Sequence, residues 1–358
     1  MTFFIIFIGA FGLSILTTVF VRGLARHFGV LAEPGGRRLH KKAVPLLGGV
    51  ALFIALVLIV VVLTSFGWLP GSHIKAKYLV GIIAAAGLLS FGGALDDRYE
   101  LKPWQQFIWP FLAVLAVIVV GIGVNYITNP FGGLIELNKY IMTAVWIDGI
   151  PYKLTILADI FTLAWLMTMT YTTKFLDGLD GLVVGLTVIG GLVIAAVSLM
   201  REVAQPDTAI LALAIAGVFA GFLVFNIYPA RIFLGEGGST LAGFLLGILA
   251  IISGGKIATT LLVLGLPLFD AAIVIIRRLV RGKSPFGGDR SHLHFLLVDS
   301  GLPQRSVVLL YWFLAALFGI STLILPGPQK VTAIGVALSL LLVILAGALI
   351  MQKRNSIK

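Results

Sequence analysis

Residues 46–66 read LLGGVALFIALVLIVVVLTSF, a run of 21 positions without a charged side chain. At 1.5 Å per residue, a helix of about this length crosses roughly 30 Å of hydrocarbon. Similar windows, long and almost free of charge, occur at about 2–21, 78–95, 104–124, 155–175, 182–200, 208–228, 239–255, 257–276, 306–325 and 331–351. They lack the alternation of apolar and polar residues that marks a membrane β-strand. The sequence therefore predicts an all-α fold, a polytopic transmembrane bundle of about eleven spans.

The composition points to the same fold class. Of the 358 residues, 59% are hydrophobic and only 11% are charged, whereas soluble domains carry about 25% charged residues. These proportions exclude an intrinsically disordered chain, a coiled coil and a soluble two-domain enzyme. The chain contains no cysteine, which excludes disulfides, thiolate metal sites and a cysteine nucleophile.

The basic residues indicate which way the loops face. The first window has no positive segment before it and is followed by Arg22 and Arg26, so we expect an anchor with its N-terminus outside rather than a cleaved signal peptide. Threading the spans from that start places 19 of the 26 Lys and Arg residues inside, with a cytoplasmic C-terminus, as the positive-inside rule requires. This explains the formal charge of +11 without nucleic acid. We predict a single integral-membrane domain, 1–358, with cytoplasmic loops at about 22–45, 96–103, 174–181, 229–238 and 277–305.

Two segments are predicted not to span. Residues 124–153 combine turn residues with a short alternation of apolar and polar side chains, which is typical of a hairpin, here on the outer face. Residues 277–305 are too polar to cross a membrane and are predicted to lie inside.

Acidic residues are expensive in a membrane protein, and their positions are therefore informative. They gather in three places at predicted inner ends of spans: Asp96 with Asp97, Asp177 with Asp180, and Glu236. If Asp177 and Asp180 lie on helical backbone, they are about 5 to 6 Å apart and repel each other by roughly 3 kcal/mol at an effective dielectric near 20. Such a cluster needs a cation, a shared proton or a basic partner. Oxygen ligands favour Mg²⁺ or Mn²⁺, and Mg²⁺ completes its shell with water and substrate phosphates, so the implied substrate is phosphorylated.

Each motif also has a simpler explanation. Carboxylates at a span end are often only solvated interface residues, and Asp-Gly-Leu-Asp-Gly at 177–181 also fits a tight turn. Residues 235–239 can be a loop with Ser239 as an N-cap, although glycine N–H groups before a helix also suit a phosphate. The placement of all three motifs in one compartment favours a site.

Histidines and cations occur in two predicted inner loops. Arg290, His292 and His294 face the acids and are suited to donate to phosphate or sugar oxygens. Because His292 and His294 are two residues apart, they share a face only in extended or loop backbone, so a helix-borne zinc motif is not expected. The first inner loop adds three more such residues: His40, Lys41 and Lys42. Ordinary positive-inside charge or attraction to anionic lipid accounts for the two lysines but not for His40.

Taken in order, these motifs resemble the polyprenyl-phosphate N-acetylhexosamine-1-phosphate transferases (glycosyltransferase family 4), which load a sugar phosphate from a UDP-sugar onto undecaprenyl phosphate. The resemblance covers nearly the whole chain and rests on residues 38–49, 96–98, 177–181, 226–239, 267–270, 277–278, 289–294 and 301–305. Residues 289–294 are more similar to the N-acetylglucosamine-1-phosphate branch, which starts O-antigen of lipopolysaccharide, teichoic-acid and related polymers, than to the phospho-N-acetylmuramoyl-pentapeptide branch. The resemblance implies a multi-pass transferase of the bacterial inner membrane that acts at the cytoplasmic face and releases UMP, and it is compatible with a homodimer.

The resemblance also implies residue roles. The catalytic set would be Asp96 and Asp97, which bind or deprotonate the lipid phosphate, together with Asp177 and Asp180. Mg²⁺ (or Mn²⁺) would be held by Asp177 and Glu236. The substrate-binding set would be His40, Lys41, Lys42, Lys174, Asn226, Arg290, His292 and His294. The chain departs from the family at three positions, which usually hold Asn, Asp and His: Lys174, Glu236 and Phe295.

Two other classes remain as alternatives. A transporter-like relative would use buried Asp and His as ion sites and would place acids at mid-span; Asp159 and Asp270 are the acids that could lie deeper. A non-catalytic relative is suggested by Lys174 and Glu236. The sequence does not fix the amino sugar, the downstream polymer, or whether the lipid phosphate attacks directly or after an enzyme carboxylate.

Overall fold

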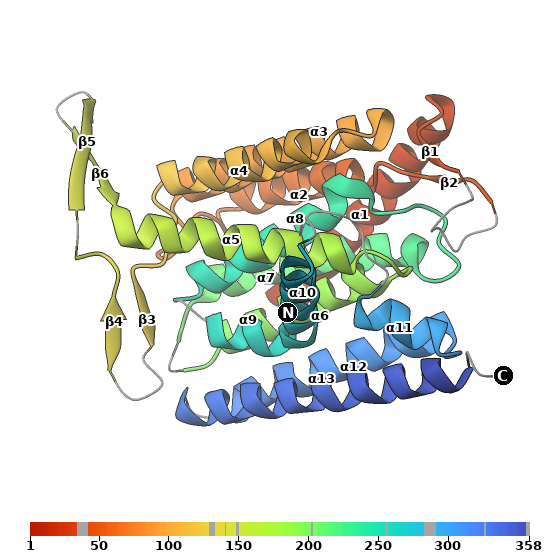
Figure 1. Ribbon diagram of the computed structural model, residues 1–358. Coiled ribbons are helices and arrows are strands. Elements are labelled where there is room, and N and C mark those ends of the chain that lie inside the picture. The colour runs from red at the N-terminus through yellow and green to blue at the C-terminus, as the bar shows by residue number, and fades with distance from the viewer. Residues whose placement is uncertain are drawn as a thin grey trace.

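The structure, a computed structural model, describes residues 1–33, 42–128, 133–139, 141–147, 150–201, 203–254, 257–282, 291–325 and 327–355. In these residues the long elements are all helices, and the strands are short pairs at the two ends of a helix bundle (Figure 1). The predicted all-α bundle is thus confirmed, with the strand pairs added to it.

Every predicted window coincides with helical structure. The helices are α1 (Thr2–His27), α2 (Gly48–Ser65), α3 (Ala76–Tyr99), α4 (Pro103–Val119), α5 (Ile156–Leu176), α6 (Leu182–Ser198), α7 (Pro206–Asn226), α8 (Gly235–Ile252), α9 (Ile257–Val263), α10 (Gly265–Val280), α11 (Leu293–Asp299), α12 (Gln304–Ile324) and α13 (Gly327–Asn355). Within the described residues, seven helices are long and apolar enough to cross a membrane, or eight if α9 and α10 form one span. The chain is therefore a multi-pass membrane protein, while eleven spans and the orientation stay predictions.

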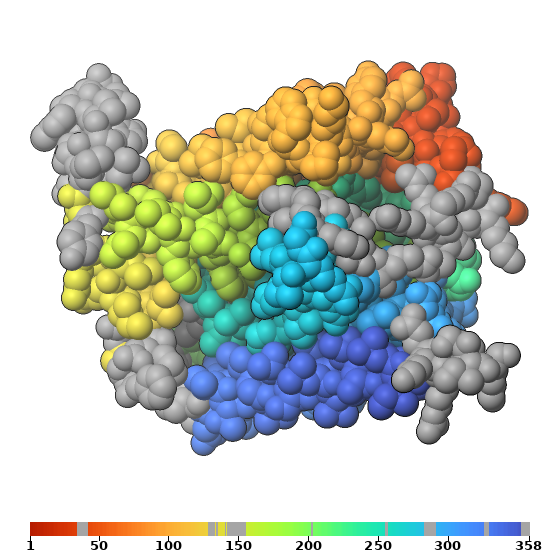
Figure 2. Space-filling view, viewed as in Figure 1, coloured from red at the N-terminus to blue at the C-terminus, as the bar shows by residue number. Residues whose placement is uncertain are grey.

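The window at 257–276 is not one straight helix. It divides into α9 and α10, which meet at 80°. Pro267 lies in the first turn of α10; it has no N–H to donate, and its ring crowds the carbonyl four residues earlier, which favours a break between the two helices. The far end of α10 stands out from the face of the bundle (Figure 2), where Val280 is 82% exposed.

The strands mark the two ends of the bundle. The predicted hairpin at 124–153 is found as two antiparallel pairs, β3 (Tyr126–Thr128) with β4 (Leu134–Glu136) and β5 (Ile141–Ile147) with β6 (Ile150–Thr155). A third pair, β1 (Leu31–Ala32) with β2 (Val44–Pro45), lies at the opposite end (Figure 1). The location of the first two pairs outside the membrane stays a prediction.

Helix α8 occupies the centre of the bundle. It packs against α2, α3, α5 and α6, and 83% of its apolar window is buried. A helix that is apolar on all sides belongs in such a position. Its first turn, with Glu236, begins at the end of the bundle where α3 and α5 finish, so the acidic residues at the ends of these helices meet.

Candidate active site

Loops that are far apart in sequence meet at one end of the bundle. Gly48 N–H donates to Phe233 O at 3.1 Å, and Asp180 Oδ2 accepts from Ala230 N–H at 2.9 Å. Arg98 reaches Phe28 O at 3.2 Å. Described parts of the predicted cytoplasmic loops therefore come together, as a shared compartment requires.

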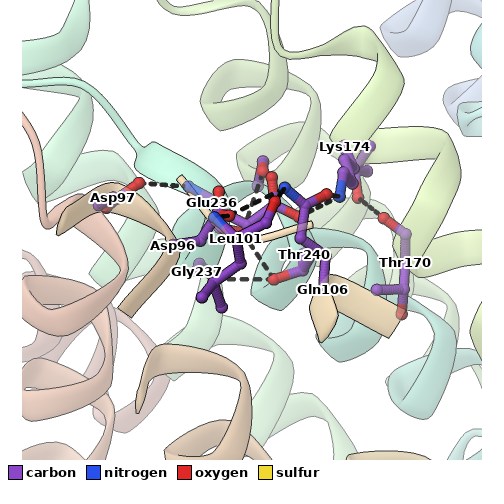
Figure 3. Close-up of polar contacts among 11 residues, drawn as sticks. Asp96, Asp97, Leu101, Gln106, Thr170, Lys174, Glu236, Gly237 and Thr240 are labelled. Carbon is purple, nitrogen blue, oxygen red and sulfur yellow. Dashed lines mark hydrogen bonds and ion pairs between the residues drawn. The ribbon is translucent and has the colours of Figure 1, made fainter. Parts of the chain in front are cut away.

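Asp97 joins the beginnings of two helices. Its Oδ1 accepts Glu236 N–H at 3.0 Å, at the start of α8 (Figure 3). Its Oδ2 accepts Leu47 N–H at 3.2 Å, at the N-cap of α2. Leu47 has a φ of 71°, a left-handed conformation that costs a bulky residue roughly 1–2 kcal/mol. Asp97 therefore holds a strained turn and a helix N-terminus at once, and both of its oxygens are used.

A continuous polar chain links four helices beside Asp97 (Figure 3). Asp96 Oδ1 accepts Gln106 Nε2 at 2.8 Å and Leu101 N–H at 2.9 Å. Gln106 Oε1 accepts Lys174 Nζ at 2.8 Å, and the same ammonium is ion-paired with Glu236 Oε1. We call Asp96, Gln106, Lys174 and Glu236 the polar chain; it brings together α3, α4, α5 and α8.

The polar chain borders a cavity of about 330 Å³. Its lining is acidic, with only two apolar side chains and one glycine among Leu31, Glu33, Leu46, Asp96, Asp97, Glu100, Gly235 and Glu236. Five carboxylates around one space repel a polyanion unless a cation accompanies it. The cavity therefore suits a cation, alone or together with a phosphate.

Asp177 follows the last turn of α5, next to the polar chain. Its N–H donates to Lys174 O at 3.3 Å; the residue is exposed at the end of the helix, while its carboxyl group is largely desolvated by the surrounding protein. Burial raises the pKa of Asp177 to about 8, and the negative charges of Glu236, Asp180 and Asp97 add to the effect. A carboxylate in such surroundings is stabilised by an added cation.

Asn226, at the end of α7, connects the turn at 177–181 to the loop before α8. Its Oδ1 accepts Gly181 N–H at 3.1 Å and its Nδ2 donates to Ile232 O at 3.0 Å. Asn226 is only 4% exposed, and both the oxygen and the nitrogen of its amide are hydrogen-bonded to backbone groups. The predicted substrate contact of Asn226 stays a prediction; the geometry gives it a positioning role.

Replacing Asn226 with Ala should lower the free energy of unfolding by about 3 kcal/mol, because it leaves a buried N–H and a buried C=O without partners. Thermal unfolding in detergent measures this loss. Ser339→Ala is the control, since Ser339 is exposed and bonds only to Gly335 O in its own helix, and it should change stability by less than about 0.5 kcal/mol. Equal unfolding temperatures for the two variants would contradict the positioning role.

The two histidines lie on and beside α11. His292 Nδ1 lies 2.9 Å from Asp270 Oδ2, and Asp270 Oδ1 accepts Leu293 N–H at 2.9 Å. His294 is fully buried, stacks on His292 at 5.7 Å and has no hydrogen-bond partner on either ring nitrogen among the described residues. Burial, and then His292, lowers the pKa of His294 to about 3, so His294 is neutral. The structure thus brings His294 next to Gly178 of the acidic turn, 2.8 Å from the position of a Cβ there.

Four of the predicted substrate-binding residues are not tested by the structure. His40, Lys41 and Arg290 lie outside the described residues, and Lys42 is exposed two residues before β2. Their roles stay predictions. Gln106 was not predicted, although a Gln-Gln pair at the start of an apolar span was a visible signal.

The predicted metal ligands fit unequally. Among the described residues, no three acidic or histidine side chains lie close enough together to hold a metal ion without other ligands. Mg²⁺ usually takes only one or two carboxylates, and Asp177 suits it because no described residue donates a hydrogen bond to its carboxylate. Glu236 does not suit it while Lys174 is paired with Oε1.

The fold and the site define the class of protein: a multi-pass membrane protein with carboxylates, an amide and a lysine gathered at one end of its bundle. The chain belongs to glycosyl transferase family 4, whose model matches residues 79–254. That range begins in α3, ends just after α8 and contains all of the polar chain.

Named relatives span most of the chain. It is 30% identical over 328 residues to the probable undecaprenyl-phosphate N-acetylglucosaminyl 1-phosphate transferase of Bacillus subtilis (strain 168), covering 88% of this chain and 84% of that protein. It is 28% identical over 358 residues to the decaprenyl-phosphate N-acetylglucosaminephosphotransferase of Mycolicibacterium smegmatis, covering 93% and 85%. The undecaprenyl-phosphate alpha-N-acetylglucosaminyl 1-phosphate transferase of Haemophilus influenzae is 29% identical over 327 residues, with 88% and 84% covered.

Proposed function

We propose that this protein transfers N-acetylglucosamine 1-phosphate from a UDP-sugar to a polyprenyl phosphate and releases UMP. The observation that carries the proposal is the acidic cavity beside the polar chain, placed where transmembrane helices end. The names of relatives that cover more than four fifths of the chain support the substrates. A lipid phosphate anchored in the membrane can reach such a position without leaving the bilayer.

The site residues take different parts in this reaction. No described residue bonds to Oδ2 of Asp96, while Oδ1 accepts from Leu101 and Gln106, so Asp96 is the acid that binds or deprotonates the lipid phosphate. Asp97 positions Glu236 and Leu47 through backbone hydrogen bonds. Asp180 orders the loop at Ala230. Asp177 faces the pyrophosphate of the UDP-sugar, and His294 lies beside the same turn, close to Gly178.

The proposed cofactor is Mg²⁺, with Mn²⁺ as a substitute. Asp177 would hold it beside the polar chain, and the metal would neutralise phosphate charge of the substrates there. The protein contributes to the reaction by positioning the two polyanionic substrates against fixed carboxylates and hydrogen-bond donors.

The proposed location is the bacterial inner membrane, with the site on the cytoplasmic face. The excess of Lys and Arg in the loops that carry the site residues supports a cytoplasmic orientation of the site. A transporter-like role gains no support, because Asp159 lies in the first turn of α5 and Asp270 is bonded to His292. A homodimer remains part of the proposal.

One assay tests the function. The purified protein is incubated with Mg²⁺, radiolabelled UDP-N-acetylglucosamine and undecaprenyl phosphate, and labelled lipid and UMP are measured. Both products should appear in equal amounts. If neither forms, the proposed function is wrong.

Removing the metal tests the cofactor separately. Excess EDTA should abolish label transfer, because the acidic cavity then repels the phosphates of both substrates. Adding Mg²⁺ in excess of the chelator should restore transfer, which excludes damage by EDTA itself. Transfer that persists in EDTA would remove the metal from the proposal.

A further inference from the structure

The ammonium of Lys174 is held at a defined position. It donates to Gln106 Oε1 at 2.8 Å, pairs with Glu236 Oε1 and lies 5.4 Å from the centre of the Tyr171 ring. The side chains of Lys174 and Glu236 are only 16% and 18% exposed. An exposed lysine is usually mobile and weakly paired, whereas this one has an amide oxygen, a carboxylate and a ring face as neighbours.

This ammonium stands where the resemblance puts a metal. Glu236 occupies a position that would ligate Mg²⁺ in the family, and Lys174 replaces an uncharged Asn there. A metal–oxygen bond is about 2.0–2.1 Å long for Mg²⁺, so a metal at Oε1 competes with the ammonium that is already paired with this oxygen. The positive charge also cancels much of the attraction of Glu236 for a dication.

Asp177 is arranged differently. It follows Lys174 by three residues, the residue as a whole is exposed, and no described residue donates a hydrogen bond to its carboxylate. Of the two predicted ligands, Asp177 is the one that no described cation is paired with, whereas Glu236 is paired with Lys174.

We propose that Lys174 is a built-in cation of this site, which neutralises Glu236 in place of a divalent metal and leaves Asp177 as the carboxylate that faces the metal. An ammonium has three N–H groups, and Gln106 and Glu236 use two of them. No described residue accepts the third, which can donate to a phosphate oxygen. The proposal rests on the proposed function in so far as that function uses a metal.

Manganese binding tests the proposal without any substrate. The full chain in detergent is titrated with Mn²⁺ alone, and free Mn²⁺ is followed by its electron paramagnetic resonance signal. Lys174→Gln should lower the dissociation constant by about tenfold or more, because Glu236 becomes an unpaired second ligand beside Asp177. A dissociation constant that is unchanged or higher would overturn the proposal.

Two further variants control the charge and the fold. Lys102→Gln removes an exposed cation from the loop between α3 and α4 and should change the constant less than about twofold. Lys174→Gln leaves Glu236 partly buried and unpaired, which destabilises the protein. The double variant Lys174→Gln with Glu236→Gln replaces an ion pair of zero net charge with two uncharged amides and is expected to fold.

The double variant should bind Mn²⁺ within about threefold of the wild type, because Glu236 is not a ligand in the wild-type protein. A dissociation constant more than about tenfold higher would show that Glu236 does bind the metal beside Lys174, and would overturn the proposal. Since no sugar nucleotide or lipid is present, a negative transferase assay leaves these outcomes unaffected.

Discussion

Asp96→Asn should lower the rate of sugar-phosphate transfer by about a thousandfold, within the range of 10²–10⁴ for a positioned acid or base, while leaving the unfolding temperature almost unchanged. An Asn carbonyl can replace Oδ1, which accepts Leu101 N–H and Gln106 Nε2. The change therefore removes the charge and the free oxygen but keeps both hydrogen bonds. Initial rates of lipid labelling and thermal unfolding in detergent measure the two effects on the same sample.

The neighbouring substitution should behave in the opposite way. Asp97 accepts a backbone N–H on each oxygen, from Glu236 and from Leu47, and Asn has only one oxygen. Asp97→Asn sets an amide N–H₂ against one of those N–H groups and should cost about 2–3 kcal/mol of stability. If Asp97→Asn instead unfolds like the wild type and loses only activity, then Asp97 acts chemically and its bracing role is wrong.

A distant acid provides the matched control. Asp159 lies in the first turn of α5, where Oδ2 accepts Thr155 N–H at 2.8 Å, at the other end of the helix from Asp177. Asp159→Asn also removes one carboxylate from the protein and should leave the transfer rate within about twofold. A large loss for Asp159→Asn would mean that the Asp96 result reports net charge rather than a site.

The positions of the helices could be predicted from sequence because a span is a local property. About twenty apolar residues in a row are sufficient to specify one, and the windows at 46–66 and 208–228 correspond to α2 and α7. The division between α9 and α10 was not predicted. Pro267 was visible in the sequence, but whether a proline kinks, breaks or merely begins a helix depends on the neighbours that replace the lost hydrogen bond.

For the site, the sequence indicated which residues gather but not how they pair. The acids could be placed at one end because the spans alternate in direction. The partners of Asp97 are 50 and 139 residues away, and nothing local encodes them. The pairing of Lys174 with Glu236 and Gln106 likewise depends on how closely α4, α5 and α8 pack. Asp97 was predicted to act on phosphate, and only tertiary structure shows that both its oxygens serve backbone N–H groups.

Gly93→Ala should be among the most damaging single changes to stability, lowering the free energy of unfolding by about 3 kcal/mol. A Cβ at Gly93 would overlap the backbone N and Cα of Gly237, where α3 crosses the first turn of α8. Backbone cannot yield as a flexible side-chain end can, so the two helices must separate. Thermal unfolding in detergent measures the loss, and Gly12→Ala is the control, because nothing lies within 4 Å of a Cβ there and Ala favours a helix by up to about 1 kcal/mol.

Gly93→Ala should also lower activity, and this distinguishes it from Asp96→Asn. In the wild-type protein, Asp97 Oδ1 accepts the N–H of Glu236 at 3.0 Å. Separation of α3 from α8 moves Glu236 away from this oxygen and thereby disturbs the ion pair between Glu236 and Lys174. Stability and transfer rate should therefore fall together in Gly93→Ala, whereas only the rate falls in Asp96→Asn. A Gly93→Ala protein that unfolds at the wild-type temperature and keeps full activity would contradict the close crossing of α3 and α8 that positions the whole site.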